Sequence, residues 1–156
     1  TTNGVVKIKQ WLVLDGGGFD IIHFNFGLHD LKRVHPETGK PSGNAAHPKQ
    51  ATSAIYAKQL RAIVAELKAS GATLIFATTT PVPEGQVSPL RDPTDVVLYN
   101  DLAKAIMKEN CIRVNDLYAF ALPKLSMLQK KSNVHFTADG TRALAEQVVN
   151  AVTAGR

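Results

Sequence analysis

Short apolar runs that alternate with longer amphipathic segments constrain this chain of 156 residues more than any other feature of its sequence. Each run is too short for a helix and is bounded by turn residues or a polar loop, as is typical of a buried strand. The runs cover residues 20–26, 72–77 and 111–114. Strands that alternate with helices predict a parallel sheet with helices on both faces. We therefore expect a three-layer α/β/α fold of the flavodoxin-like type.

Apolar residues at helical spacing fill the segments between and around these runs. Tyr56, Leu60, Ile63 and Leu67 mark one face of a long helix. We expect glycine to end that helix, threonines to cap the two later helices, and proline to interrupt the helix between them. The residues concerned are Gly71, Thr94, Thr137 and Pro123.

A sheet of three parallel strands is thin, and the sequence indicates that a part of it is missing. Parallel sheets are normally covered on both faces, and their strands are usually paired on both sides. The first run, 20–26, is among the most apolar segments and should have two neighbours. We therefore interpret residues 1–156 as one domain that lacks its N-terminal part, with the upstream strands absent from this chain.

Composition excludes several classes of function. The formal charge is +5 and the pI about 9.4, but the lysines and arginines are scattered and not interleaved with aromatic residues. This pattern favours a solvated basic surface over a nucleic-acid partner. No apolar run is long enough to span a membrane. The single cysteine, Cys111, excludes an internal disulfide, and we expect it to be buried as a small hydrophobic residue.

Chemically versatile side chains follow the predicted strands at the positions where open α/β sheets form their sites. His29 follows the first strand, Asp116 follows the third, and His135 lies in the loop before the last helix. His23 is in the middle of a strand, so we interpret it as a core or sheet-face residue. Gly16–Gly18 follows a helix and is interpreted as a turn. We expect no metal and no cofactor, because no metal-ligand or phosphate-binding motif is present.

Two motifs resemble blocks of the SGNH, or GDSL-type, hydrolases. Phe24 to Asp30 resembles the third block, G-x-N-D, with a histidine in place of the asparagine. Val134 to Thr137, followed by Asp139-Gly140, resembles the last block, D-x-x-H-x-x-x-x-G. The first block, which carries the nucleophilic serine, and the second block are absent. The resemblance covers essentially the whole chain.

The resemblance implies roles for particular residues. His135 would be the general base, and His29, framed by Gly27 and Asp30, would donate a hydrogen bond to the oxyanion. The position of the acid three residues before the histidine is Ser132, so the orienting group is left open. It could be Ser132, Asn133, Asp116 or a backbone carbonyl. Arg91 and the loop 32–48 are expected to contact substrate.

The resemblance therefore implies a serine esterase that acts on a small ester or an acylated carbohydrate. We expect the serine on a missing N-terminal segment, supplied as a separate chain or by another copy, so that this chain alone is inactive. The alternative is a catalytically inactive SGNH-like binding or accessory domain, which the absent acid favours. A receiver or nucleotide-binding domain is less well supported, because acidic clusters and a glycine-rich loop are missing. Localisation in a bacterium, whether cytoplasmic, periplasmic or secreted, stays open.

Overall fold

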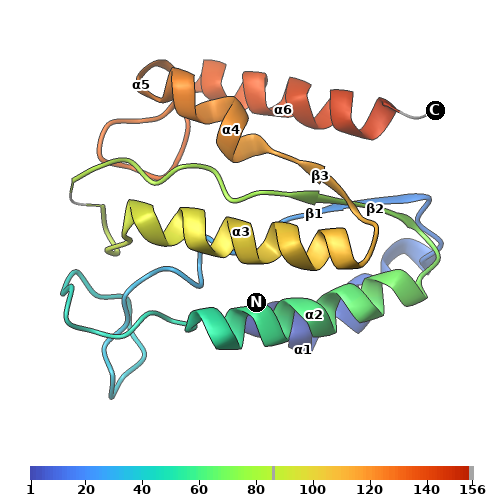
Figure 1. Ribbon diagram of the computed structural model, residues 1–156, viewed down its shortest axis with the longest axis horizontal. Coiled ribbons are helices and arrows are strands. Elements are labelled where there is room, and N and C mark those ends of the chain that lie inside the picture. The colour runs from blue at the N-terminus through green and yellow to red at the C-terminus, as the bar shows by residue number, and fades with distance from the viewer. Residues whose placement is uncertain (86, 155–156) are drawn as a thin grey trace.

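A single parallel sheet forms the centre of the computed structural model, which describes residues 1–85 and 87–154 (Figure 1). Its strands are β1 (Ile21–Phe24), β2 (Thr73–Ala77) and β3 (Arg113–Asn115), in the order β1-β2-β3. Ile22 is paired with Leu74, and Phe76 with Val114. This register confirms the predicted parallel sheet and the order of its strands along the chain.

Helices lie on both sides of this sheet, which confirms the three-layer α/β/α prediction (Figure 1). One side carries α1 (Thr2–Trp11), α2 (Ser53–Ala69) and α3 (Pro93–Glu109). The other side carries α4 (Leu117–Ala121), α5 (Leu125–Leu128) and α6 (Ala138–Thr153). Two short 3-10 turns complete the order, η1 (Leu14–Gly16) and η2 (Leu122–Lys124).

The predicted ends of the helices are mostly those observed. Thr137 accepts a hydrogen bond from the Gly140 backbone N–H at 3.0 Å and so caps α6. Pro123 lies in η2, where it interrupts the segment between α4 and α5. The prediction for Thr94 was wrong, because Asp92 caps α3 and accepts from the Thr94 N–H at 2.9 Å. Pro93 at the first helical position fits this cap.

The prediction of a buried Cys111 was also wrong. Cys111 is exposed and has a φ of 56°, a left-handed conformation that belongs to the turn between α3 and β3. Its backbone N–H donates to the Lys108 carbonyl at 3.2 Å, which continues the end of the helix into the turn. Strand β3 consequently begins two residues later, at Arg113.

The main core lies between the sheet and the helices α2 and α3. Leu60 and Ile63 on α2, Phe76 on β2 and Val96 on α3 are fully buried. Core tyrosines also hold the loops: the Tyr56 hydroxyl donates to the Phe26 carbonyl at 2.9 Å. The loop that follows β1 is therefore fixed to the same core that supports α2.

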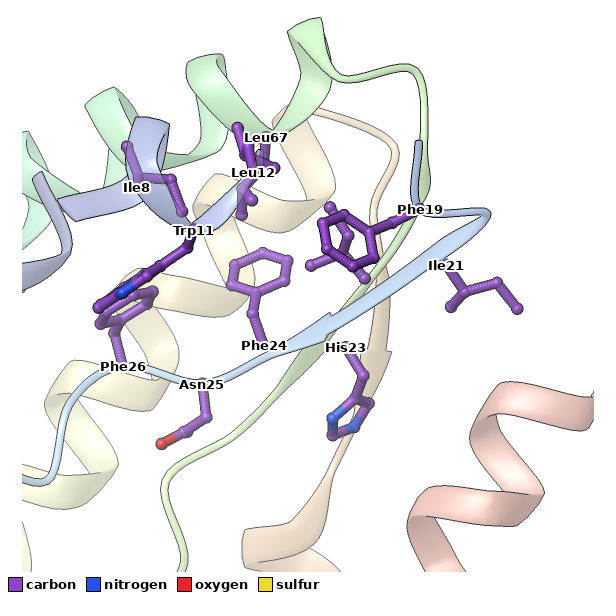
Figure 2. A pocket seen from close by; sticks show the side chains of 11 residues that line it. Ile8, Trp11, Leu12, Phe19, Ile21, His23, Phe24, Asn25, Phe26 and Leu67 are labelled. Carbon is purple, nitrogen blue, oxygen red and sulfur yellow. The ribbon is translucent and has the colours of Figure 1, made fainter. Parts of the chain in front are cut away.

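Strand β1 is at the edge of the sheet and is paired only with β2 in the part of the chain that the structure describes. Its outer edge lines a groove of about 470 Å³, together with aromatic side chains such as Trp11, Phe19 and Phe26 (Figure 2). The open edge thus falls on the strand for which the sequence predicts a further neighbour. Within the described residues, no helix has both the length and the apolar character that crossing a bilayer requires.

Candidate active site

Three loops gather at the carboxyl ends of the strands (Figure 1). They follow β1 at residues 25–52, follow β2 at residues 78–92, and precede α6 at residues 129–137. Open α/β sheets form their binding sites at this end. His29 belongs to the first loop and His135 to the last, so both predicted histidines lie on loops at this end of the sheet, which we call the rim.

The turn after β1 needs a glycine for two reasons. Gly27 has a φ of 150°, a conformation that side chains other than glycine rarely adopt. A Cβ atom at this position would also overlap Oγ1 of Thr79 on the loop after β2. The glycine of the G-x-N-D-like motif therefore lets the two loops approach one another, and the Asp30 backbone N–H closes the turn by donating to the Gly27 carbonyl at 2.8 Å.

His29 projects from this turn and is exposed. Partial burial, followed by the nearby charges of Lys32 and Arg91, lowers the pKa of its imidazole below the ordinary value. A lowered pKa keeps the ring neutral near pH 7, with one ring N–H available to donate. Lys32 and Arg91 would also stabilise negative charge that develops beside the ring.

Asp30 fixes the backbone of the turn that carries His29. Its carboxylate is 1% exposed, and both oxygens accept from the amino nitrogen of Thr1, at 2.7 and 2.8 Å. The Thr1 hydroxyl donates to the same group at 2.7 Å. These contacts attach the start of α1 to the turn that carries His29.

His135 is exposed in a tight hairpin, and its ring is held by Asn133. The Nδ1 atom of His135 lies 2.7 Å from Oδ1 of Asn133, and the His135 backbone N–H donates to the same oxygen at 2.9 Å. Ser132 has a φ of 50° and forms the turn of the hairpin. Of the orienting groups that the sequence left open, Asn133 is the one whose hydrogen bond to the imidazole is seen in residues 1–85 and 87–154.

Gly140 explains the glycine of the last motif. A Cβ atom at this position would overlap the carbonyl oxygen of Leu128 at the end of α5. The same carbonyl accepts hydrogen bonds from the Thr137 backbone N–H at 2.8 Å and from its hydroxyl at 3.0 Å. The first turn of α6 is therefore pressed against the end of α5, and this contact fixes the base of the His135 hairpin.

Asp116 is occupied by other partners. Its carboxylate accepts from the Thr78 hydroxyl at 2.9 Å and from the Ala119 N–H at 3.1 Å, and it forms an ion pair with Lys104 at 2.7 Å. Burial raises the pKa of this carboxyl, but the hydrogen bonds and the Lys104 charge outweigh that effect, and the net pKa is lowered. Asp116 thus caps α4, and its hydrogen bonds and ion pair within the described residues are not with His135.

The loop after β2 connects the two histidine loops. Arg91, which is 5% exposed, donates through Nε to the Leu28 carbonyl at 2.8 Å and so holds the turn of His29. On the other side, Gln129 donates to the Pro81 carbonyl at 2.8 Å and so holds the hairpin of His135. This arrangement gives Arg91 a structural role, and its predicted contact with substrate stays a prediction.

Sequence analysis did not identify Gln129 and Thr79, two residues that hold the loops of the site in place. Gln129 carries no local signal, because its role depends on a carbonyl group 48 residues away. Thr79 is fixed by Asn100, whose side-chain oxygen accepts from the Thr79 N–H at 2.9 Å and whose amide donates to the Thr79 carbonyl at 2.8 Å. Such pairings become visible only in the fold.

His23 occupies the sheet face, as predicted. Its Nε2 lies 3.2 Å from Nδ2 of Asn115 on β3, and burial lowers its pKa. Figure 2 shows its ring and Asn25 on the opposite side of β1 from Phe24. Within residues 1–85 and 87–154, no group of three or more His, Cys, Asp or Glu side chains could hold a metal ion.

The groove along β1 leads to His29. A second cavity, of about 330 Å³, is lined by His29 and Gly27 and shares Trp11, Asn25 and Phe26 with the groove. The two cavities are therefore neighbours along β1 and the turn that follows it. A chain segment lying in this groove would come close to His29 at the end of the strand.

Comparison with known structures identifies the fold. A lipase/acylhydrolase from Enterococcus faecalis matches with a TM-score of 0.75 and 17% sequence identity, over 97% of this chain and 69% of that protein. An acetyl xylan esterase matches with a TM-score of 0.71 and 15% identity, over 94% and 73%. An acetyl-xylooligosaccharide esterase from Geobacillus matches with a TM-score of 0.74 and 18% identity, over 97% and 67%.

The chain therefore has the α/β fold of the SGNH, or GDSL-type, hydrolases, as the two sequence motifs predicted. It spans about 70% of the length of these structures (69% and 73% for the first two). No family model and no curated protein matches the sequence.

Proposed function

We propose that this chain is the histidine-bearing part of a serine ester hydrolase. The observation that carries the proposal is the contact of 2.7 Å between His135 Nδ1 and Asn133 Oδ1, on a loop that shares a rim with His29. An acceptor at Nδ1 leaves Nε2 with a free lone pair, which is the state that a general base requires.

In the proposed mechanism, a serine hydroxyl attacks the ester carbonyl while Nε2 of His135 takes the hydroxyl proton. The tetrahedral intermediate collapses, and the imidazolium returns that proton to the leaving alcohol. Water then attacks the acyl-enzyme with His135 again as the base, which releases the acid and the free serine. Ring N–H donation from the neutral His29 stabilises the oxyanion in both steps, and Lys32 and Arg91 add positive charge nearby.

The serine is proposed to lie on a segment that occupies the groove beside β1. An edge strand with an apolar groove beside it can accept a further strand, whose backbone groups would pair with the free edge. The groove adjoins the cavity at His29, because Trp11, Asn25 and Phe26 line both, so the end of such a strand would come close to the proposed oxyanion donor. The segment is supplied by a separate chain, by another copy or by a longer form of this protein.

We propose an O-acylated carbohydrate as the substrate. Two of the structural neighbours are named as esterases of acetylated xylan or xylooligosaccharides. Loop 32–48 follows the turn of His29, and ion pairs of Arg33 and of the adjoining Lys49 anchor it to Asp95 at the start of α3. A loop fixed in this way is suited to contact the alcohol part of the substrate.

The neutral Asn133 favours a second candidate, an inactive SGNH-like domain that binds a ligand without turnover. An amide at the orienting position cannot stabilise an imidazolium as a carboxylate does. The two candidates differ in one measurable property, which is turnover of an ester that depends on His135.

The test is hydrolysis of 4-nitrophenyl acetate and of acetylated xylooligosaccharide by the protein together with its serine-bearing segment. His135→Ala should lower kcat by about 10⁴-fold, as triad removals do. His29→Ala should lower it by about 10²–10³-fold, and His29→Asn should retain more activity because it restores a donor. Thermal unfolding of each variant serves as the folding control. Turnover by His135→Ala above a tenth of the wild-type rate would exclude the proposed mechanism.

A further inference from the structure

The amide of Asn133 has a defined orientation, which settles the chemistry of its contact with His135. Its Oδ1 lies 2.7 Å from the ring Nδ1 and 2.9 Å from the His135 backbone nitrogen. A backbone N–H can only donate, so the atom that faces it must be the acceptor oxygen and not the amide nitrogen. The same oxygen therefore faces the imidazole.

An acceptor at Nδ1 selects one tautomer of the neutral ring. The ring proton must reside on Nδ1, and Nε2 must carry the lone pair. In water without such a contact the imidazole would exchange between both tautomers, and its ring would be free to rotate about the side-chain bonds. The hairpin fixes the position of the amide, because the Asn133 N–H donates to the Lys130 carbonyl at 3.2 Å and the Lys130 N–H donates to the His135 carbonyl at 3.0 Å.

The acceptor carries no charge, and the contacts of Asp116 and Asp139 are with other residues. Asp116 is paired with Lys104 at 2.7 Å. Asp139, at the start of α6, has a side chain that is 88% exposed and lies 4.0 Å from Arg142. Among the hydrogen bonds and ion pairs of residues 1–85 and 87–154, none joins His135 to a carboxylate.

We propose that Asn133 is a positioning residue that fixes the Nδ1–H tautomer of His135 without supplying charge, so that the site operates with a neutral Asn–His pair. The tautomer part stands on the geometry alone. Its catalytic consequence rests on the proposed function. A carboxylate in place of the amide would keep the same acceptor atom and would add the negative charge that stabilises an imidazolium.

The first experiment measures the tautomer and needs no activity. In ¹⁵N-labelled protein at about pH 8.5, where a histidine is neutral by its ordinary pKa, the His135 ring should show a protonated Nδ1 and an unprotonated Nε2. Asn133→Leu removes the acceptor at similar volume and should give the averaged shifts of exchanging tautomers. Ser132→Gly, which suits the left-handed φ of 50° at the neighbouring position, should leave the spectrum of His135 unchanged.

The second experiment measures the missing charge. Asn133→Asp should retain the Nδ1–H signature, move the acidic limb of the pH profile of kcat/KM to higher pH, and raise kcat/KM about tenfold at neutral pH. Asn133→Leu should lower kcat roughly 10- to 100-fold with little change in KM. Because aspartate is nearly isosteric with asparagine, this variant keeps the test valid even if the leucine variant does not fold.

The outcomes distinguish this inference from the proposed function. A leucine variant that keeps the Nδ1–H tautomer, or an aspartate variant with an unaltered pH profile and rate, overturns the positioning role of Asn133. The expected tautomer signatures in a protein without esterase turnover would support the positioning role and overturn the proposed function instead.

Discussion

The two sides of the sheet differ in how completely they are packed. On the side of α2 and α3, residues such as Leu60, Ile63 and Phe76 are entirely buried. On the side of α6, the helix buries only Gly140, and its apolar residues Leu144 and Val148 are half-buried. Helix α6 contacts the sheet at β3, and β1 on the far edge is left open to the groove.

This difference shows where apolar surface is left uncovered. Burying an aliphatic side chain contributes roughly 1.5–3 kcal/mol, and the side of α2 and α3 obtains that contribution in full. Apolar surface remains along α6 on the other side, and at the outer edge of β1, where residues of α1 and α2 line the groove. Solved structures with this fold are longer than the chain, which spans 69% of one and 73% of another. We interpret the open side as the surface on which further structure packs.

The largest expected contrast is in stability. Ile63→Ala, in the closed core, should lower the free energy of unfolding by about 2–5 kcal/mol, because the cavity cannot collapse. Ile21→Ala removes the same atoms from a half-buried position at the open edge and should cost less than about 1 kcal/mol. Chemical denaturation of both variants measures the difference, and equal losses would show that the two sides are packed alike.

Much of the closed side could be predicted from local patterns. The run 72–77 is β2 with nearly the same ends, and Thr137 caps α6, because both depend on nearby residues. The cap at Asp92 was also within reach, since Pro93 favours the first helical position. Cys111 was wrongly predicted to be buried, because a left-handed turn overrides the apolar pattern there. The hydrogen bond from Gln129 to the Pro81 carbonyl could not be predicted, because it joins residues distant in sequence.

For the candidate site, the sequence pointed to the two histidines but not to the residue that contacts the His135 ring. The motifs indicated His29 and His135, whereas the position of the acid pointed to Ser132 and the structure places Asn133 at the ring. A turn decides this, because Ser132 adopts a φ of 50° and points the chain so that the next residue reaches Nδ1. Motif spacing alone does not encode that turn.

Hydrogen exchange tests the open edge with an intermediate effect. Amides of β2 are enclosed between two strands, whereas β1 has one edge that pairs with no strand of the described residues. In this chain alone, the amides of β1 that point away from β2 should exchange at least about tenfold faster than those of β2. Adding the proposed serine-bearing segment should slow exchange in β1 and leave β2 nearly unchanged. Protection of β1 in the isolated chain would mean that its edge is already covered, by another copy or by a local rearrangement.

The smallest expected effect is on the pH dependence of stability, through His23 on strand β1. Burial lowers the pKa of His23, so the unfolded chain binds a proton more readily than the folded chain does. Stability should therefore fall as the pH drops below the ordinary histidine pKa of about 6.5, and should be constant well above it.

His23→Leu should lose less stability between pH 7.5 and pH 5 than the wild type does. Part of the loss should remain, because the lowered pKa of His29 has the same sign. The leucine variant also leaves Asn115 without its contact at 3.2 Å, which lowers stability at every pH, so the readout is the change with pH and not the absolute value. Urea denaturation at the two pH values measures it, and an equal loss in both proteins would show that the open side does not restrict the protonation of His23.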